Sequence, residues 1–350
     1  MKTKLITSNR QEELAPEEDS SGLSRAGFLQ RASLLSAALL EPTVLRAEGW
    51  TRNEFNDRST AEDVTRGLNL TGKSILITGA SSGLGLETAR VLAMRGATVY
   101  AAARTIEKAR AAADPLSGKL VPVACELTDF TSVEACANTV TAKARSLDAV
   151  ICNAGIMANP ELQTVGGLEK QFVVNYLGHV HLVQKLLPAL ERAQQGRIVL
   201  VSSDTAPPQG GIEFDNLDGS KSYEGWAAYG QSKLACALFA AEFTRRNRGS
   251  SVTANSLIPG TINTGLFDDL SSGMKVFLSL FGGLFVFDKN IQQGAATHSF
   301  LAAHPSVAGV SGKFFDDCNV IEAPNRYVDD ALLAGRLWEQ TARLIRTYQR

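Results

Sequence analysis

The sequence predicts an α/β fold: a doubly wound parallel sheet of about seven strands in a single domain at residues 67–350. Short apolar runs alternate with helical segments over roughly 250 residues, as in sheets whose strands are joined by crossover helices. The runs lack strict polar–apolar alternation, which is typical of parallel strands buried on both faces. A glycine-rich loop also stands between the first run and the first helix.

Each element follows from this alternation along the chain. The short apolar runs are expected to be strands at 74–78, 97–103, 120–124, 148–152, 197–202, 252–258 and 312–315. The segments between and after them are expected to be helices at 87–96, 106–114, 132–144, 168–193, 227–246, 292–302 and 331–349.

Residues 1–66 differ in composition and are expected to be a mostly disordered N-terminal extension, since they include an acidic stretch containing Ser and Gly. Within it, residues 24–47 resemble a degenerate twin-arginine export signal. Ser24 and Arg25 match that pattern, but Ala26 replaces its second arginine. The apolar part is also short for a secretory signal, which typically needs about 7–15 residues.

The bulk composition argues against several classes of function. The chain has 350 residues, 44% of them hydrophobic, and a formal net charge of -1, so no overall charge draws it to nucleic acid. Its five cysteines have no paired spacing and its four histidines suggest no ligand set, which argues against a disulfide framework or a metal site. No apolar run reaches the roughly 18 residues of a membrane helix.

The glycine-rich loop has the spacing GxxxGxG, formed by Gly79, Gly83 and Gly85. Glycine permits a tight turn and a close approach of backbone to phosphate, and the next helix offers free N–H groups to an anion. Between the first strand and first helix of a doubly wound sheet, such a loop predicts a dinucleotide site. A turn that only requires glycine's backbone freedom is the alternative.

Arg104 follows the second predicted strand, where NAD sites place an acid for the ribose 2′-hydroxyl. No Asp or Glu stands between it and Glu107. An arginine here suits the 2′-phosphate of NADP. We therefore expect NADP(H), with NAD less favoured; a solvated arginine at a strand end is the alternative.

Tyr229 stands four residues before Lys233 in a run of good helix formers. Residues four apart share a helix face, so the phenol and the ammonium are expected to be neighbours. Such pairs are common by chance, and an aromatic ring stacked on a lysine stem would suit a solvated helix face equally well. The pair alone does not distinguish chemistry from structure.

Together these motifs resemble the short-chain dehydrogenase/reductase family over residues 68–325. The matching motifs occur in the family's order: TGASSGLG at 78–85, CNAG at 152–155, Asn175 in FVVNYLGH, Ser203 in VLVSSD, YGQSK at 229–233 and PG at 259–260. Within the family the chain is most similar to the retinol dehydrogenase and protochlorophyllide reductase-like branch. The resemblance implies a Rossmann fold and an enzyme acting on CH–OH or C=O groups.

The resemblance also implies the site residues. Tyr229 would be the general acid/base, its pKa moved toward working pH by Lys233 and the oxidised nicotinamide. Lys233 would hold the nicotinamide ribose, Ser203 the substrate oxygen, and Asn175 a water chain from Lys233 to solvent. The expected cofactor-binding residues are Gly79, Ser81, Ser82, Gly83, Leu84, Gly85, Arg104, Glu126, Leu127, Asn153, Ala154, Gly155, Tyr229, Lys233, Pro259, Gly260, Ile262 and Thr264.

Several of these assignments have alternatives. Ser202 and Ser203 alternate along a strand, so only one can face the site; the family position favours Ser203. Asn175 could instead be a helix-bending core amide. Glu126 replaces the family's usual Asp near the adenine, which would weaken that contact or move it to the backbone of Leu127. Cys152 is expected to be a buried filler.

The function expected from these residues is hydride transfer between NADP(H) and the alcohol or carbonyl group of a lipophilic substrate, such as a retinoid, a steroid or a long-chain aldehyde. Light-dependent reduction of a C=C bond, as in protochlorophyllide reductases, is the alternative. A non-catalytic dinucleotide sensor is a remote one, because both the glycine loop and the Tyr–Lys pair are intact.

Residues 264–290 are expected to form a lid over the substrate. Its apolar part, 276–287, is a candidate for peripheral membrane contact or for a helix buried against the core. A homo-oligomer is compatible with the sequence, and no nucleic-acid partner is expected. The unpaired cysteines favour a cytoplasmic protein over a periplasmic one exported through the 24–47 signal.

Overall fold

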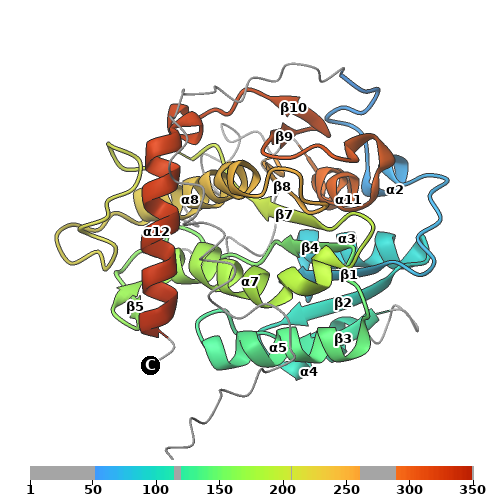
Figure 1. Ribbon diagram of the computed structural model, residues 1–350, viewed down its shortest axis with the longest axis horizontal. Coiled ribbons are helices and arrows are strands. Elements are labelled where there is room, and N and C mark those ends of the chain that lie inside the picture. The colour runs from blue at the N-terminus through green and yellow to red at the C-terminus, as the bar shows by residue number, and fades with distance from the viewer. Residues whose placement is uncertain (1–51, 114–119, 206, 261–288, 349–350) are drawn as a thin grey trace, which may run out of the picture. The chain divides into compact units, whose positions relative to one another are not determined.

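An eight-stranded sheet forms the centre of the protein (Figure 1). The computed structural model describes residues 52–113, 120–205, 207–260 and 289–348, all of which belong to one compact unit, residues 40–350. The strands, in spatial order, are β3 (Leu120–Ala124), β2 (Thr98–Ala103), β1 (Ser74–Thr78), β4 (Ala149–Cys152), β7 (Arg197–Val201), β8 (Thr253–Leu257), β9 (Phe314–Asp316) and β10 (Asn319–Ile321).

The strands from β3 to β9 run parallel, and β10 pairs antiparallel with β9. The predicted doubly wound parallel sheet is therefore confirmed, with β10 as an additional strand. Asp317 and Cys318 make the tight turn before β10, with φ of 46° and 62°. Such turns usually carry glycine or asparagine, so no hairpin was recognisable in the sequence.

The order of the strands creates a switch point beside β1. The chain moves outward from β1 to β2 and β3, then crosses back to β4 on the other side of β1. In open α/β sheets, ligands bind in the crevice that such a reversal leaves at the carboxyl ends of the strands. The glycine-rich loop leaves β1 at this point.

Helices cover both faces of the sheet (Figure 1). On one face α3 (Gly83–Met94) packs against α11 (Ala296–Ala303), and on the other α5 (Phe130–Lys143) packs against α7 (Gly178–Glu191). Helix α8 (Gly225–Arg246) contacts β7 and β8. The remaining short helices are α4 (Ile106–Ala113), α10 (Ile291–Gly294) and the 3₁₀ turns Pro305–Val307 and Arg326–Asp329.

The segment 168–193 is not the single helix that the sequence predicted. Its first residues form β6 (Leu168–Glu169), which pairs with β5 (Thr164–Val165) across a turn of two glycines with positive φ. Three elements then follow in continuous succession: α6 (Lys170–Phe172), a π-helix (Val173–Leu177) and α7. The helical part starts late because Glu169 is its N-cap, and the Glu169 carboxylate accepts the Phe172 N–H at 2.8 Å.

Residues 52–66, expected to belong to the extension, pack against the sheet unit. Asn53 donates its backbone N–H to Asn319 Oδ1 at 2.9 Å and its amide to Cys318 O at 2.8 Å. The Phe55 ring meets Phe300 of α11 edge-on at 5.7 Å. Helix α2 (Ala61–Val64) then contacts α11 and α3.

The C-terminal helix α12 (Ala331–Tyr348) covers α8 (Figure 1). Its buried residues, Ala334, Leu337, Trp338, Thr341, Ala342 and Ile345, recur every three or four positions and so form one apolar stripe. Trp338 stacks on Phe239 of α8 at 5.3 Å, and the Arg246 guanidinium lies 5.2 Å from the Trp338 ring.

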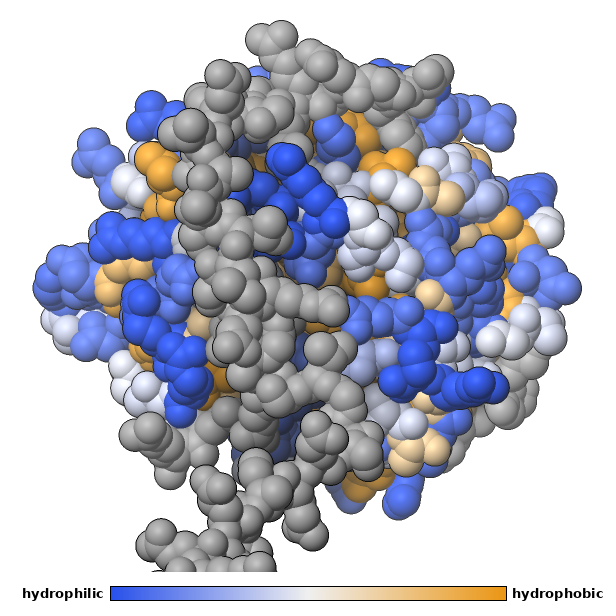
Figure 2. All heavy atoms as spheres, viewed as in Figure 1, coloured by the Kyte–Doolittle hydropathy of each residue, from blue (hydrophilic) through white to orange (hydrophobic). Residues whose placement is uncertain are grey.

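The described surface is mixed in polarity. Only Met94, Leu162 and Leu332 are large apolar side chains exposed among the described residues, and Figure 2 shows apolar groups scattered among polar ones on one face. No helix in the described ranges is long and apolar enough to span a membrane. The candidate export signal, the lid at 264–288, Ile262 and Thr264 lie outside the described residues.

Candidate active site

The glycine-rich loop is held in a conformation that only glycines permit without strain. Gly79 and Gly83 have φ of 66° and 54°, in the left-handed region. A Cβ on Gly85 would lie 2.3 Å from Gly79 O and 2.6 Å from Asn153 Nδ2. The three glycines therefore let the start of α3 fold tightly over the end of β1.

The N-terminus of α3 is suited to bind an anion. Its N-cap, Ser82, makes no side-chain capping hydrogen bond, and the first turn contains no acidic residue. The orphan N–H groups and the helix dipole together favour a phosphate at this place. The geometry thus fits a dinucleotide at the loop of Gly79, Ser81, Ser82, Gly83, Leu84 and Gly85.

Asn153 and Ala154, which follow β4, fix the loop from the neighbouring strand. Asn153 Nδ2 donates to Thr78 O at 2.8 Å. The backbone N–H groups of Asn153 and Ala154 both donate to Thr78 Oγ1 at 3.0 Å. Of the predicted residues 153–155, Asn153 and Ala154 therefore directly support the glycine loop.

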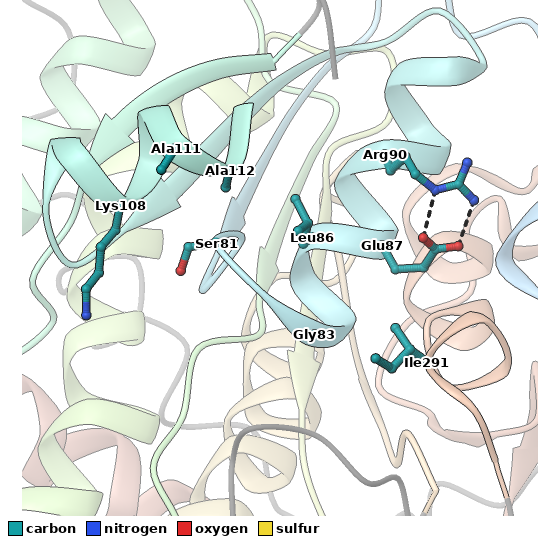
Figure 3. Close-up of a pocket in the computed structure, with 9 residues that line it drawn as sticks. All are labelled: Ser81, Gly83, Leu86, Glu87, Arg90, Lys108, Ala111, Ala112 and Ile291. Carbon is teal, nitrogen blue, oxygen red and sulfur yellow. Dashed lines mark hydrogen bonds and ion pairs between the residues drawn. The ribbon is translucent and has the colours of Figure 1, made fainter. Parts of the chain in front are cut away.

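A pocket of about 660 Å³ lies beside the loop, between α3 and α4 (Figure 3). Ser81 and Lys108 line one side of it, and the Glu87–Arg90 ion pair lines the other. Arg104 is exposed just after β2 and has no ion-pair partner among the described residues. Lys108 was not predicted as a site residue, although its position one helical turn after Arg104 was a usable signal.

Glu126 and Leu127 follow β3 at the same edge of the sheet. Glu126 Oε1 accepts hydrogen bonds from the N–H and the hydroxyl of Thr128, at 3.0 and 2.8 Å. One carboxylate oxygen is thus used within its own turn, as for an Asx-like cap. Leu127 is buried, and its carbonyl oxygen would lie 2.4 Å from a Cβ on Gly178.

Asn175 sits in the π-helix, where a wide turn interrupts the α-helical ladder. Such single π-turns are frequent at functional sites. The amide of Asn175 makes three hydrogen bonds: Oδ1 accepts from Ile156 N–H at 2.9 Å, and Nδ2 donates to Ile156 O at 3.0 Å and Ser232 Oγ at 2.9 Å. Asn175 therefore binds the backbone after β4 to α8.

Tyr229 and Lys233 share one face of α8, as their spacing predicted. Both are buried, and Lys233 Nζ lies 5.7 Å from the centre of the Tyr229 ring. The ammonium donates to Val201 O at 3.0 Å. A Cβ on Gly155 would lie 3.4 Å from Lys233 Nζ and 3.3 Å from Asn175 Oδ1, so Asn175, Lys233 and the turn after β4 converge at one point.

The two serines after β7 face opposite ways. Ser202 is buried and donates its hydroxyl to Lys233 O at 2.8 Å. Ser203 is half-buried, and one hydrogen bond of 2.9 Å joins its hydroxyl to the hydroxyl of Thr205. Because Ser202 is used to hold α8, the geometry leaves Ser203 as the serine beside Tyr229.

Pro259 and Gly260 follow β8 at the same edge. Gly260 has φ of 82°, and a Cβ there would lie 2.8 Å from Cδ of Lys289. Lys289 forms ion pairs with Asp316, at 3.4 Å, and with Asp317. Sequence reasoning missed this lysine, since nothing in the sequence around it marks it as a neighbour of Gly260.

Burial dominates the electrostatics of the site. It raises the pKa of the Tyr229 phenol, and the Ser203 hydroxyl opposes that rise. It also lowers the pKa of Lys233. The protein groups alone therefore do not supply the lowered Tyr229 pKa expected from Lys233, whose ammonium is hydrogen-bonded to Val201 instead. Burial also raises the pKa of Cys152, as expected for an inert filler.

Thr78, His179 and Ser232 are buried residues of the site that the sequence did not reveal. Thr78 Oγ1 lies 2.8 Å from His179 Nε2, and His179 Nδ1 lies 2.9 Å from Asn175 O. Ser232 accepts from Asn175 and donates to Tyr229 O at 2.7 Å. Their contacts join elements far apart in the chain, which no local pattern could indicate.

Comparisons with known proteins agree with this geometry. The short chain dehydrogenase family model matches residues 73–275. The chain is 37% identical to the short-chain dehydrogenase TIC 32 B, chloroplastic, of Brassica napus over 308 residues, covering 84% of this chain and 95% of that protein. It is 38% identical to human retinol dehydrogenase 11 over 288 residues, covering 80% and 88%.

A solved structure agrees as well. The crystal structure of an uncharacterized protein from Mycobacterium paratuberculosis is 33% identical, with a TM-score of 0.64, and covers 80% of this chain and 96% of that one. The family match spans the glycine loop, Asn175, Ser203 and the Tyr229–Lys233 pair. The chain therefore belongs to the short-chain dehydrogenase/reductase family of oxidoreductases, on its retinol dehydrogenase-like branch.

Proposed function

We propose that this protein is an NADP(H)-dependent oxidoreductase that interconverts the alcohol and carbonyl forms of a lipophilic small molecule. The observation that carries the proposal is the convergence of Lys233 and Asn175 at the Gly155 position, with the Tyr229 ring beside Lys233. A general acid, a buried cation and a dinucleotide cradle at one sheet edge are the groups that such a reaction needs.

A nicotinamide cofactor, when bound, supplies or accepts the hydride at the substrate carbon. Tyr229 donates the proton to the carbonyl oxygen in reduction and accepts it from the alcohol in oxidation. Burial raises the pKa of the phenol, so Tyr229 carries the proton that reduction requires. Ser203, the hydroxyl beside Tyr229, holds the same substrate oxygen.

Lys233 and Asn175 orient the rest of the site. The Lys233 ammonium is fixed by Val201 O, and its position next to Gly155 suits it to hold the hydroxyl groups of the nicotinamide ribose. The Asn175 side chain joins the backbone at Ile156 to the Ser232 hydroxyl by hydrogen bonds. Asn175 Oδ1 keeps a second lone pair that could hold a water, so a proton path to solvent would run from Lys233 past Asn175.

NADP(H) is favoured over NAD(H) by positive charge at the ribose position. Arg104 is exposed after β2 without an ion-pair partner among the described residues. Lys108 and Ser81 line the pocket between α3 and α4 (Figure 3). A guanidinium and an ammonium suit the 2′-phosphate that distinguishes NADP. Glu126, partly engaged by Thr128, leaves the backbone of Leu127 as a contact for the adenine.

The surroundings of Tyr229 and the sequence similarity to a retinol dehydrogenase support a lipophilic substrate. Trp226 is half-buried and meets the Tyr229 ring edge-on at 6.3 Å, which provides an apolar wall beside the acid. One relative at 38% identity is named retinol dehydrogenase 11. The substrate class proposed is therefore a retinoid, a steroid or a long-chain aldehyde.

We also propose a cytoplasmic location. All five cysteines are buried and free, which suits a reducing compartment. Export to the periplasm is the competing location, and it depends on residues 24–47. Fractionation of cells that express the full chain tests it: recovery of a shortened form in the periplasm would replace this proposal. Membrane contact through 276–287 and homo-oligomer formation are compatible with it.

The test is a panel of lipophilic aldehydes, ketones and alcohols with NADPH, NADH and their oxidised forms, in light and in darkness. We expect aldehyde reduction with NADPH in both conditions, measured as loss of nicotinamide absorbance. Turnover only in light would favour double-bond reduction of the protochlorophyllide type. Tight NADPH binding without turnover on any member of the panel would favour a non-catalytic sensor.

A further inference from the structure

His179 is buried at the start of α7, between the glycine loop and the π-helix. Its side chain is fully inaccessible to solvent. Nε2 lies 2.8 Å from Thr78 Oγ1, and Nδ1 lies 2.9 Å from the backbone oxygen of Asn175. One imidazole therefore spans the gap between the strand that carries the dinucleotide loop and the turn that carries Asn175.

The tautomer of His179 follows from counting donors. Asn175 O is a carbonyl oxygen and can only accept, so Nδ1 carries the proton. Burial lowers the pKa of His179 to about 4, so the ring is neutral at pH 7 and Nε2 can only accept.

The same counting orients Thr78. Its oxygen already accepts from Asn153 N–H and Ala154 N–H, so its single proton is left to donate. Two acceptors are near: His179 Nε2 at 2.8 Å and Ile151 O at 3.3 Å. The contact with His179 is shorter and its Nε2 is unprotonated, so the Thr78 hydroxyl donates to His179. The chain of donors thus runs from residues 153–154 through Thr78 and His179 to Asn175 O.

This series of hydrogen bonds ends on Asn175, whose side chain is bonded to other residues of the site. Asn175 holds both backbone groups of Ile156 and donates to Ser232. Ser232 in turn donates to the backbone oxygen of Tyr229. Cys236 of α8 adds a second, weaker donor to Asn175 O at 3.3 Å. The glycine loop and the Tyr229 helix are therefore connected through one imidazole and one amide.

We infer that His179 is a positioning residue that locks the dinucleotide loop, through Thr78, to the Asn175 turn and hence to Tyr229. It touches neither substrate nor reacting atoms. Its neutral ring supplies one donor and one acceptor in fixed directions, which no apolar side chain of the same shape can do. The effect on turnover rests on the proposed function; the effects on the tautomer and on cofactor affinity do not.

His181 is a matched control on the same helix. It is equally buried, but it stacks on Phe130 of α5 at 4.4 Å and pairs with Glu134 at 3.4 Å. It faces away from the glycine loop. Replacing either histidine by Phe removes a buried imidazole from α7, so a general loss of stability would appear in both variants.

The experiment compares H179F, H179Q and H181F with the wild-type enzyme. We expect H179F to weaken NADPH binding and to lower kcat, together by about tenfold, since a lost buried hydrogen bond costs about 1–1.5 kcal/mol. H179Q, whose amide offers a donor and an acceptor, should recover most of that loss. H181F should lower the melting temperature without changing cofactor affinity. H179F should cost less in a T78V background than in the wild type, because the bond between Thr78 and His179 is then already absent.

An independent readout is the tautomer itself. Nitrogen NMR of the histidine-labelled protein should show two imidazoles in the Nδ1–H form that do not titrate between about pH 5 and pH 8. One is His179, and the other is the buried His298, whose Nδ1 lies 3.1 Å from Gly294 O. The chain has four histidines, and the one of these two signals that is lost in H179Q belongs to His179. Equal cofactor affinity and kcat in H179F and H181F, or an Nε2–H tautomer, would overturn the inference. If the wild type turned over no substrate, the tautomer and NADPH affinity would still decide it.

Discussion

The cofactor side and the substrate side of the site are held together in different ways. The glycine loop is fixed by backbone contacts that tolerate no added atom, as at Gly85, and by buried hydrogen bonds from residues 153–154. On the substrate side, residues 207–224 lie between Ser203 and α8. They are held by scattered hydrogen bonds, among them those to Gln231 and Asn159, and by side chains from the C-terminal part of the chain. Gly210 N–H donates to Tyr327 OH at 2.9 Å, and the Arg336 guanidinium lies 4.0 Å from the Phe214 ring.

The difference reflects what each side must do. A dinucleotide presents the same phosphates and riboses in every reaction, so one close-packed loop suits it. A segment held by separate hydrogen bonds and ring contacts can change shape at modest cost, because each contact contributes only about 0.5–1.5 kcal/mol. Changes on the cofactor side should therefore affect binding and rate strongly, and changes on the substrate side should affect KM mildly.

Tyr229 lies where the two sides meet, and its loss should have the largest effect. Tyr229→Phe removes the proton donor but keeps the ring that packs on Trp226. We expect kcat to fall by about 10²- to 10⁴-fold, the usual contribution of a general acid. NADPH affinity, measured by fluorescence titration, should stay within about twofold, because the phenol makes no contact with the glycine loop. Near-normal turnover would assign the proton to another group.

The second change tests the rigidity of the cofactor side. Gly85→Ala would place a methyl group 2.3 Å from Gly79 O, which forces backbone apart. Overpacking of this kind costs about 1–3 kcal/mol, so NADPH affinity should fall by roughly 10- to 100-fold. Gly335→Ala in α12 is the control: its methyl would lie 3.8 Å from the nearest atom, Glu242 Oε1, and should leave affinity unchanged. Equal affinities in the two variants would mean that the loop is not where the dinucleotide binds.

How much the sequence could predict differs between the two sides in the same way. The strands at 74–78 and 197–202, the glycine loop and the Tyr229–Lys233 pair are local patterns, and the structure has them where they were expected. Local signals also located Asn175 but not its partners. Ser232 and Ile156 lie 57 and 19 residues away, and only the folded sheet brings them together.

The failures have specific physical causes. Helix 168–193 was expected to be continuous because apolar residues fill it, yet the glycine turn at 166–167 pairs its first residues as a strand, and a π-turn breaks its middle. The β9–β10 hairpin turns on Asp317 and Cys318 rather than glycine. The contacts of residues 207–224 with Tyr327 and Arg336 span more than a hundred residues, beyond any pattern read along the chain.

Arg104 tests cofactor choice, with a smaller expected effect. Arg104→Asp should weaken NADPH by roughly tenfold or more, since a charge-assisted hydrogen bond is worth about 1.5–3 kcal/mol. NADH, which lacks the 2′-phosphate, should be affected little, so the ratio of kcat/KM values for the two cofactors measures the change. Arg110→Asp, an equal charge change at an exposed position of α4, is the control. A wild type that already prefers NADH would refute the assignment of Arg104.

The smallest effect is expected from Tyr327, which tests the substrate side alone. Tyr327→Phe removes the oxygen that accepts the Gly210 N–H but keeps the ring that lies close to the α position of Gly211. The bond is exposed, so its loss should raise KM for the aldehyde by only about threefold, close to the lower end of what one hydrogen bond contributes. Cofactor affinity should not change, because no hydrogen bond joins this segment directly to the glycine loop among the described residues. Tyr348→Phe removes a hydroxyl from the C-terminal end of α12, where it donates to Thr128 O at 3.2 Å, and should leave the aldehyde KM unaltered. A Tyr327→Phe variant that lost NADPH affinity instead would show that the two sides are coupled, and would contradict the contrast between a rigid cofactor side and an adaptable substrate side.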